Sequence, residues 1–413
     1  MSGATRRVLG NLALALVSLG FTLGMLELAA PWLLPRLPLK LHFALDRYQR
    51  VLAQSSKQGV VPEPPYVAIL GDSYAMGLGD WLIDADPDTN GPYHAAHVLH
   101  QRTGLDVVSF GRSGDSSMGA YVKRPFQTLR YLASTRFALP APDLFVAYFY
   151  VGNDLEDNLR DLHWSYEGEY DADRLFDPDY FADYLTEEWV EEQRPWRWRP
   201  SLNDRPVVSR VIRKTLTHAL VGWPEGFEPH VIHEGDTNRA RMEGGVTALP
   251  EPLQSASVAL DEEQLETGLY VFEQSLRYLH ARMPEVPILL VLVPAPVTTY
   301  PMSSPKISAL SGKEGDSTAE LYPREQVARR ADRVCARLVR VAEALEIGFL
   351  DARQGLWPVA RERFIHGPKD WAHFNQAGYT ALAGTIAPEL TSRPLRRGRC
   401  ADVSAYFASI PAS

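Results

Sequence analysis

Residues 66–74 read Tyr-Val-Ala-Ile-Leu-Gly-Asp-Ser-Tyr, a short apolar run that passes directly into a Gly-Asp-Ser turn. The five residues that open this stretch predict a buried β-strand, because they are too few for a core helix and turn residues follow them. Similar apolar runs recur at 105–110, 144–150, 288–293 and 347–350. Between them, apolar side chains spaced for one helical face occur in 265–283 and 327–345. This alternation predicts an α/β fold with a parallel sheet that helices cover on both faces.

Polar and glycine-containing motifs follow the first three predicted strands. Ser73 lies in the turn after the first strand, and Gly114 lies in the glycine-containing stretch 107–115 after the second. Asn153 follows the third strand. Functional groups of a parallel sheet gather beyond the carboxyl ends of its strands, so we expect these residues to face one cleft. Taken alone, the Gly-Asp-Ser motif is more typical of a helix cap than of an active site, and the other two motifs are typical of turns.

A further motif, Asp370-Trp371-Ala372-His373, stands near the C-terminus. A carboxylate three residues before an imidazole can reach it within one helical turn. A hydroxyl, an imidazole and a carboxylate form the set that activates a serine for attack on an ester carbonyl. His366 lies close in the sequence but has no carboxylate at a comparable spacing, so we interpret it as a loop residue.

In their order along the chain, the motifs resemble the four sequence blocks of the SGNH, or GDSL, hydrolase family. The matching stretches are Gly71-Asp72-Ser73, Val107–Asp115 with Gly114, Gly152-Asn153-Asp154 and Asp370–His373. The resemblance covers about 66–153 and 285–390. One position departs from the family pattern: Ser109 stands where an Asn often precedes the glycines of the second block.

The resemblance implies a three-layer α/β/α (flavodoxin-like) domain and a division of labour among five residues. Ser73, Asp370 and His373 would form the catalytic triad. The backbone N–H groups of Ser73 and Gly114 and the side chain of Asn153 would form the oxyanion hole. Chemistry of this kind requires no metal and no other cofactor.

The N-terminal stretch 8–26 is uncharged and nearly as long as the ~20 residues that cross a bilayer core, which predicts one transmembrane helix. A cleaved signal peptide is the alternative. The residues around Ala29 and Ala30 make a poor cleavage site, which favours a retained anchor. Arg6 and Arg7 orient the N-terminus toward the cytoplasm. We therefore expect a single-pass protein of the inner membrane whose catalytic domain is periplasmic or extracellular.

Composition and motif positions divide the chain into five parts. They are a cytoplasmic stub with the transmembrane signal anchor (1–34), a proline-rich juxtamembrane stalk (35–65), the SGNH-like hydrolase domain (66–154 and 261–392), an insertion (155–260) and a C-terminal tail (393–413). The insertion is dense in aromatic and charged residues. It is either a lid that meets substrate or a helical insertion that packs its own aromatic side chains. The stretch 301–320, rich in serine and glycine, predicts a flexible loop.

The charge of the chain argues against nucleic acid as a partner. Its 413 residues carry a formal net charge of -9, and no basic stripe occurs along the sequence. Aspartates between 157 and 179 do not follow the spacing of a calcium-binding loop and predict a solvated acidic surface.

The cysteines and a row of histidines suggest no metal site. Cys335 and Cys400 are far apart and are either two buried thiols or one disulfide. His94, His97 and His100 drift around a helix at three-residue steps, without a thiol or acidic ligand to complete a zinc set. We interpret them as helix-surface residues.

Together these observations predict a serine esterase that hydrolyses acyl esters, acetyl among them, of a cell-envelope carbohydrate or lipid. An O-acyltransferase that modifies an exported polysaccharide or peptidoglycan would use the same triad and differ only in its acceptor. A binding module without catalysis, on the same fold, is the third hypothesis.

Overall fold

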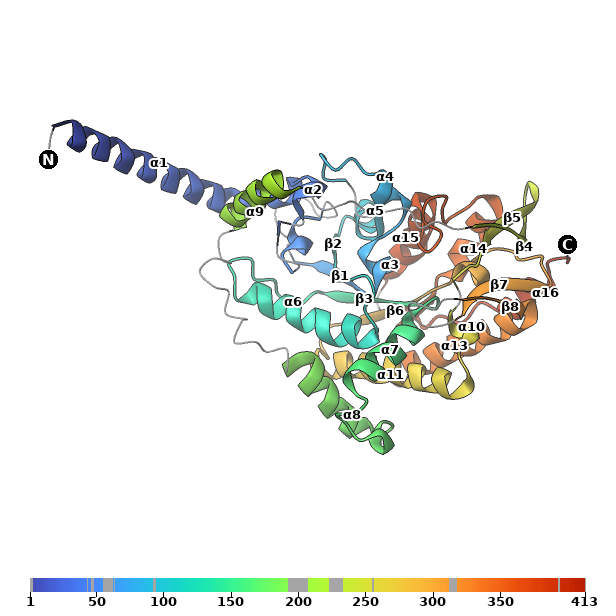
Figure 1. Ribbon diagram of the computed structural model, residues 1–413. Coiled ribbons are helices and arrows are strands. Elements are labelled where there is room, and N and C mark those ends of the chain that lie inside the picture. Colours follow the sequence, from blue (N-terminus) through green and yellow to red (C-terminus); the bar gives the residue numbers. More distant parts are fainter. Residues whose placement is uncertain are drawn as a thin grey trace.

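The computed structural model describes residues 3–42, 44–45, 48–54, 62, 64–91, 94–191, 207–222, 233–254, 256–311, 318–392 and 394–412. Figure 1 shows a long N-terminal helix that projects from an α/β body. The helices are α1 (Gly3–Leu33), α2 (Leu39–His42), α3 (Ser73–Met76), α4 (Asp80–Asp84), α5 (His94–Thr103), α6 (Arg124–Ala133), α7 (Asp154–Ser165), α8 (Pro178–Tyr184), α9 (Val207–Val221), α10 (Ala256–Ala259), α11 (Glu262–Arg282), α12 (Pro296–Thr299), α13 (Arg324–Ala344), α14 (Arg353–Glu362), α15 (Gln376–Leu390) and α16 (Val403–Ala408).

A sheet of five parallel strands forms the centre of the body. Its strands are β1 (Tyr66–Leu70), β2 (Asp106–Ser109), β3 (Leu144–Tyr150), β6 (Ile288–Val293) and β9 (Gly348–Asp351), in the spatial order β2-β1-β3-β6-β9. All four neighbouring pairs are parallel. Ile69 of β1 is paired with Ser109 of β2, and Val146 of β3 is paired with Leu289 of β6. The five predicted strands and the parallel α/β fold are therefore confirmed.

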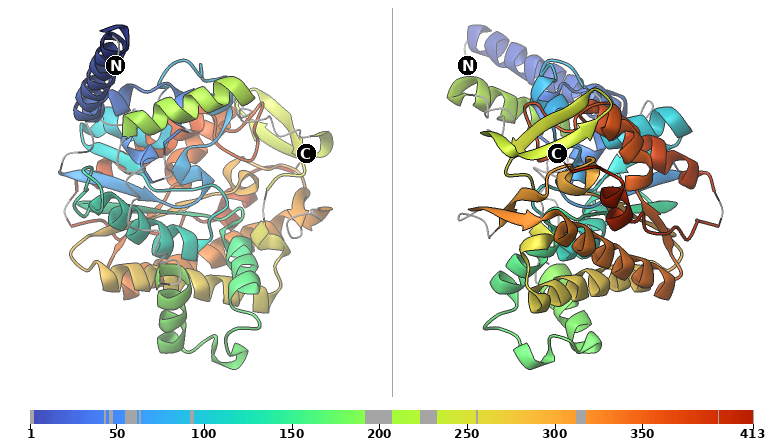
Figure 2. Two further views of the ribbon diagram at one scale, coloured as in Figure 1. Left: turned by 60° about the vertical axis from the view of Figure 1, so that its left-hand side comes forward. Right: turned by 90° about the vertical axis from the view of Figure 1, so that its right-hand side faces the viewer.

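Helices cover both faces of this sheet. Alternate strand residues point to opposite sides, and both sets are apolar, so each face packs against helices. On one face, Val67, Ile69 and Val146 pack in a core cluster with residues of α5, α14 and α15. On the other face, Ala68 and Phe145 pack with residues of α6, α11 and α13. Figure 2 shows these helices around the sheet from two further sides. Both long helices predicted from apolar spacing are present, as α11 and α13.

Helix α1 is long and apolar enough to cross a membrane, by length and composition. The span Thr5–Arg36 has a mean hydropathy of 2.0, and none of its most apolar window is buried inside the molecule. At the domain end the chain enters the core, where Ala30 and Leu34 are buried. Beyond them, Leu45 and Leu52 belong to the same core cluster. The described part of the expected stalk, 35–65, thus packs onto the domain and is not an extended linker.

Two antiparallel hairpins lie outside the main sheet. They are β4 (His233–Met242) with β5 (Gly245–Glu251), and β7 (Lys306–Ser311) with β8 (Thr318–Pro323). Strands of the second hairpin occupy 306–311 and 318–320 of the stretch 301–320, so the prediction of a flexible loop was wrong for these described residues. Ile307 and Ala309 are fully buried, and this burial, rather than the serines around them, decides the structure.

Several aromatic residues at the start of the insertion pack against one another, whereas Trp164 is exposed. Tyr166, Tyr170 and Tyr184 lie ring against ring, with centroids 4.8–5.3 Å apart. Phe181 and Tyr184 have no exposed surface. The cluster also includes Met118 and Tyr270 of the hydrolase-like domain, so this part of the insertion packs onto that domain, and the rings of Phe181 and Tyr184 are not available to a substrate. Trp196 and Trp198, also considered for a lid, lie outside the described residues.

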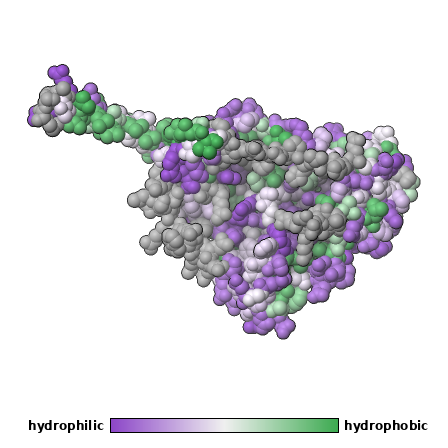
Figure 3. All heavy atoms as spheres, viewed as in Figure 1, coloured by the Kyte–Doolittle hydropathy of each residue, from purple (hydrophilic) through white to green (hydrophobic). Residues whose placement is uncertain are grey.

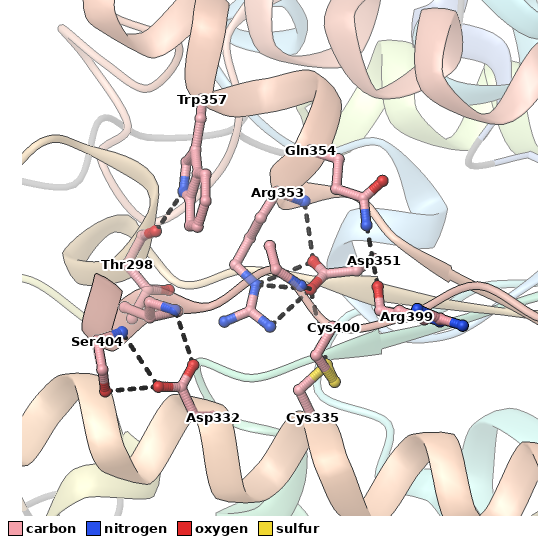
Figure 4. Close-up of polar contacts among 12 residues, drawn as sticks. Thr298, Asp332, Cys335, Asp351, Arg353, Gln354, Trp357, Arg399, Cys400 and Ser404 are labelled. Carbon is pink, nitrogen blue, oxygen red and sulfur yellow. Dashed lines mark hydrogen bonds and ion pairs between the residues drawn. A yellow bond between two sulfur atoms is a disulfide. The ribbon is translucent and has the colours of Figure 1, made fainter. Parts of the chain in front are cut away.

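A disulfide and hydrogen bonds, drawn in Figure 4, join the C-terminal tail, 393–413, to the edge of the sheet. Cys400 forms a disulfide with Cys335 of α13, so of the two alternatives left open by the sequence the structure has the disulfide and not two thiols. The Asp351 carboxylate at the end of β9 pairs with Arg353 at 2.6 Å and accepts the backbone N–H of Ala401 at 2.8 Å. These contacts make the tail part of the domain.

Candidate active site

Ser73 lies where β1 passes into the short helix α3. Asp72 is the N-cap of this helix, and its carboxylate accepts a hydrogen bond from the backbone N–H of Tyr74 at 2.9 Å. Gly71 has φ +143°, and an added Cβ would lie 3.1–3.2 Å from Tyr148 of β3. The tight turn therefore needs glycine and presents the Ser73 hydroxyl at the carboxyl end of the sheet.

Ser73, His373 and Asp370 form one continuous row of polar contacts. The Nε2 atom of His373 lies 2.9 Å from Ser73 Oγ, and its Nδ1 atom lies 2.7 Å from Asp370 Oδ2. The other carboxylate oxygen of Asp370 accepts the backbone N–H of Ala372 at 3.0 Å. Asp370 is 5% exposed, so water competes little for this carboxylate. The structure thus brings together the three residues of the predicted triad.

Helix α4 holds the loop that carries Asp370. The Asp80 carboxylate accepts the backbone N–H groups of Lys369, at 3.1 Å, and Asp370, at 2.6 Å. Burial raises the pKa of Asp80, although these two donors act in the opposite direction. The side chain of Lys369 pairs with Asp84 on the same helix. Sequence reasoning did not identify Asp80, and its place one helix after the serine motif carries no distinctive signal.

Two tyrosines join the serine motif to the histidine motif. Tyr74 donates its hydroxyl hydrogen to the carbonyl oxygen of Ala372 at 2.6 Å, and Tyr379 donates to that of Leu78 at 2.6 Å. The Tyr74 ring also packs beside the imidazole of His373, with centroids 5.3 Å apart. The position of His373 is therefore fixed by the hydrogen bond to Ala372 before it and by that of Tyr379 after it, as well as by its contact with the Asp370 carboxylate.

A second acceptor lies beside the Ser73 hydroxyl. Its Oγ atom is 3.2 Å from Asp72 Oδ2 as well as 2.9 Å from His373 Nε2. A hydroxyl has one proton to donate. Burial raises the pKa of Asp72. A protonated Asp72 would donate to Oγ instead of accepting from it, and the serine proton would then point to His373.

The two other candidate oxyanion donors are linked by Asp157 and Arg160 of α7. Arg160 donates to the carbonyl oxygen of Gly114 at 2.8 Å and also pairs with Asp157. The second oxygen of Asp157 accepts one N–H of the Asn153 amide at 2.9 Å. The amide nitrogen has two hydrogens, so one remains for another acceptor. A spacing of four residues from Asn153 to Asp157 was the sequence signal for this contact.

Further contacts shape the loop that contains Gly114. Asp115 and Arg124 form a buried two-pronged pair, with one N···O distance of 2.7 Å. Upstream, Ser109 donates its hydroxyl hydrogen to the Ala75 carbonyl at 2.6 Å and accepts the N–H of Gly111 at 3.0 Å. The serine that departs from the family pattern thus connects the second motif to the helix of Ser73.

Gln54 supports the same strand end from the expected stalk. Its amide group accepts the backbone N–H of Ser109 at 3.0 Å and donates to the Ser109 carbonyl at 3.1 Å. This contact links residues 55 positions apart, and nothing in the local sequence predicts it.

Buried carboxyl groups surround the serine motif. Burial and the charge of Asp72 raise the pKa of Asp154 well above its usual range. Burial also raises the pKa of Asp157 to about 8, although Arg160 acts in the opposite direction. Asp157 is 7% exposed, so the expectation of a solvated acidic surface is wrong at this position. Carboxyls crowded in this way hold protons at pH values where exposed ones are ionised.

Two of the histidines set aside in the sequence are buried. His366 has no exposed surface, and its Nδ1 atom lies 3.1 Å from the Tyr300 hydroxyl. Burial lowers the pKa of His366 to about 3, so it stays neutral. His100 is 8% exposed with Nδ1 2.6 Å from the Leu105 carbonyl, so the prediction of a surface residue was wrong there. Neither histidine reaches Ser73.

Among the described residues, no three His, Cys, Asp or Glu side chains are grouped so as to hold a metal ion. No model of a known protein family matches the chain, and no curated protein matches it. The assignment of an activity therefore depends on the geometry of the site.

Proposed function

We propose that the chain is a serine esterase in which Ser73 is the nucleophile, His373 the general base and Asp370 the residue that orients the imidazole. The observation that carries the proposal is the row of contacts of 2.9 and 2.7 Å through His373. Nucleophile, base and orienting carboxylate at hydrogen-bond distance are the geometric signature of this chemistry.

The reaction would proceed through an acyl-enzyme. Ser73 Oγ bonds to the ester carbonyl carbon while its proton passes to His373 Nε2. The carbonyl oxygen becomes negatively charged and is bound by the backbone N–H groups of Ser73 and Gly114 and by the Asn153 amide. The C–O bond of the ester then breaks, and the alcohol leaves with the proton from His373. Water attacks the acyl-enzyme with His373 again as base, and the acid and free Ser73 are released.

The order and placement of the motifs support membership of the SGNH hydrolase family. Ser73, Gly114 and Asn153 follow β1, β2 and β3, which are neighbours in the sheet. The aspartate and histidine of the fourth motif meet Ser73 from the C-terminal end of the chain. A family member would hold its three oxyanion donors at these positions.

Helix α1 supports the proposal that the domain with Ser73 lies at the outer face of a membrane. Signal-peptide cleavage after Ala29 or Ala30 would remove Glu27, whose carboxylate accepts the backbone N–H groups of Val207 and Ser209. The disulfide between Cys335 and Cys400 is typical of proteins in oxidising compartments. An anchored esterase on that side meets acyl esters of envelope carbohydrates and lipids, which are the proposed substrates.

The test is hydrolysis of p-nitrophenyl esters, from acetyl to octanoyl, by the full-length protein in detergent micelles. Full length is needed because α1 contributes to the core. Ser73→Ala should abolish turnover, whereas Ser134→Ala, which removes a hydroxyl bonded to the Tyr131 carbonyl, should not. A serine-reactive phosphonate should label Ser73. Labelling without hydrolysis would favour acyl transfer to a sugar hydroxyl, and absence of both in folded protein would favour a binding module.

A further inference from the structure

Helix α9, residues Val207–Val221, lies against the domain end of α1. Figure 2 (left) shows α1 rising steeply from the molecule while α9 runs across its upper side. If α1 stands along the membrane normal, α9 therefore lies close to the membrane plane. At ~1.5 Å per residue its length is about 22 Å, enough to cover a substantial part of that side.

A carboxylate of α1 fixes the start of α9. Glu27 accepts the backbone N–H of Val207 at 2.9 Å and that of Ser209 at 3.0 Å. These are among the N–H groups that a helix leaves without internal partners, and the positive end of the helix dipole favours a carboxylate. These two hydrogen bonds explain why the apolar part of α1 is followed by an acidic residue, Glu27.

The position of Glu27 sets the depth of this contact. Glu27 follows Arg7 by 20 residues, which span about 30 Å of helix, the thickness of a hydrocarbon core. With Arg7 at the inner boundary of the membrane, Glu27 and the first turn of α9 lie at the outer boundary. The contact is thus located where lipid headgroups meet acyl chains.

The solvent-facing side of α9 is apolar. Ile212, Leu216 and Leu220 follow at four-residue steps on one face and are 40%, 60% and 88% exposed. Arg213, which is also exposed, stands beside this face on the same helix. In Figure 3, hydrophobic colouring continues from α1 onto the surface where α9 joins it, with hydrophilic residues below. An exposed apolar face with a cation at its edge is typical of helices that lie in a bilayer interface.

We propose that α9 is a second membrane contact, an amphipathic helix seated in the outer leaflet of the bilayer that α1 crosses. The proposal rests on the membrane-spanning position of α1 proposed above. Lipid is the occupant because the apolar face continues the lipid-facing surface of α1 and begins at the boundary depth. Arg213 would meet anionic headgroups. Two contacts, unlike one, fix the tilt of the domain and hold the Ser73 site at a constant height above the lipid.

The experiment uses full-length protein in vesicles of phosphatidylethanolamine and phosphatidylglycerol. Both native cysteines are in the disulfide, so one introduced cysteine can carry an environment-sensitive fluorophore. The variants are Leu220→Cys on α9, Phe21→Cys within α1, and Leu321→Cys, an exposed leucine on β8 that serves as the matched control. Spin-labelled lipids quench probes in the bilayer, and iodide quenches probes in water.

We expect lipid quenching of the probes at 21 and 220, with the probe at 220 responding to shallow spin labels. Only the probe at 321 should be open to iodide. A probe at 220 as open to iodide as that at 321, with the probe at 21 protected, would overturn the interfacial position of α9 alone. Iodide quenching at 21 as well would overturn the spanning position of α1, on which this inference rests. Ester hydrolysis in the same vesicles tests the proposed activity separately.

Discussion

Arg160 donates a hydrogen bond of 2.8 Å to the carbonyl oxygen of Gly114, and the same guanidinium pairs with Asp157, the partner of the Asn153 amide. One side chain thus positions two of the three proposed oxyanion donors. Lysine cannot reproduce this two-pronged geometry. Arg160→Lys should lower kcat by about 10-fold or more, with little change in KM, because positioning of transition-state donors is lost.

The control for Arg160 is Arg174→Lys. Arg174 pairs with Asp177 at 2.9 Å on an exposed surface, where an ion pair contributes little. Equal kcat values for Arg160→Lys and Arg174→Lys would remove Arg160 from the positioning of the site.

Asn153→Ala should reduce turnover by about 10²–10³, the usual effect of losing one oxyanion donor. The Asn153 amide uses one hydrogen on Asp157, and the proposed mechanism requires the other. Gln354→Ala is the matched control, since it removes an amide bonded to the Arg399 carbonyl away from the triad. Steady-state hydrolysis of p-nitrophenyl esters checks both. Full activity in Asn153→Ala would show that this amide does not bind the oxyanion.

Gly79→Ala should destabilise the protein by about 2–5 kcal/mol, through steric overlap and an unfavourable backbone conformation. Gly79 has φ +142°, and an added Cβ would lie 2.1 Å from the carbonyl oxygen of Phe374. The neighbouring His373 would have to move, so esterase activity should fall as well. At Gly91 a Cβ meets nothing closer than 3.5 Å, and Gly91→Ala should be tolerated. Thermal melting and activity assays compare the two; equal melting temperatures would contradict the close approach.

His366 should make the protein sensitive to acid. Burial lowers its pKa from 6.5 to about 3, so between these values the unfolded chain binds a proton that the native protein does not. Its contribution to stability is present above pH 6.5 and is lost as the pH falls toward 3. Relative to His366→Phe, the wild-type free energy of unfolding should fall more steeply in this window, by up to about 1.4 kcal/mol per pH unit.

Denaturant unfolding from pH 7 to pH 4 measures this difference. Trp164→Phe, at an exposed residue that does not titrate, is the control and should leave the slope unchanged. Parallel curves for wild type and His366→Phe would show that the pKa of His366 does not differ between the native and unfolded states.

The central sheet was predictable from the sequence because its strands are buried on both faces. Strands such as 66–70 and 288–293 are therefore continuous apolar runs that no surface pattern interrupts. The β4–β5 hairpin was missed because His233–Met242 is mainly polar and has no apolar alternation. The packing of the expected stalk was also missed, because it depends on long-range contacts such as that of Gln54 with Ser109.

The motifs predicted which residues meet at Ser73 because the chemistry requires those residue types near strand ends. The contacts that hold them were mostly unpredictable. Asp80 accepts hydrogen bonds from the backbone N–H groups of Lys369 and Asp370. Since every residue except proline has such an N–H group, the sequence does not indicate which residues are the partners. The contact of Asp157 with Asn153 could have been predicted from their spacing of one helical turn, but the sequence was instead interpreted as placing Asp157 on a solvated surface.

Ser73 and His373 lie 300 positions apart in the chain, and the hydrogen bond between Tyr379 and Leu78 spans 301. During synthesis, the proposed nucleophile therefore leaves the ribosome long before its base exists. An exported chain would cross the membrane as an inert precursor and acquire reactivity only near completion. The same separation means that one proteolytic cut between Ser73 and Cys335 leaves serine and imidazole on different fragments that are held together only by noncovalent packing, because both disulfide cysteines stay on the histidine fragment.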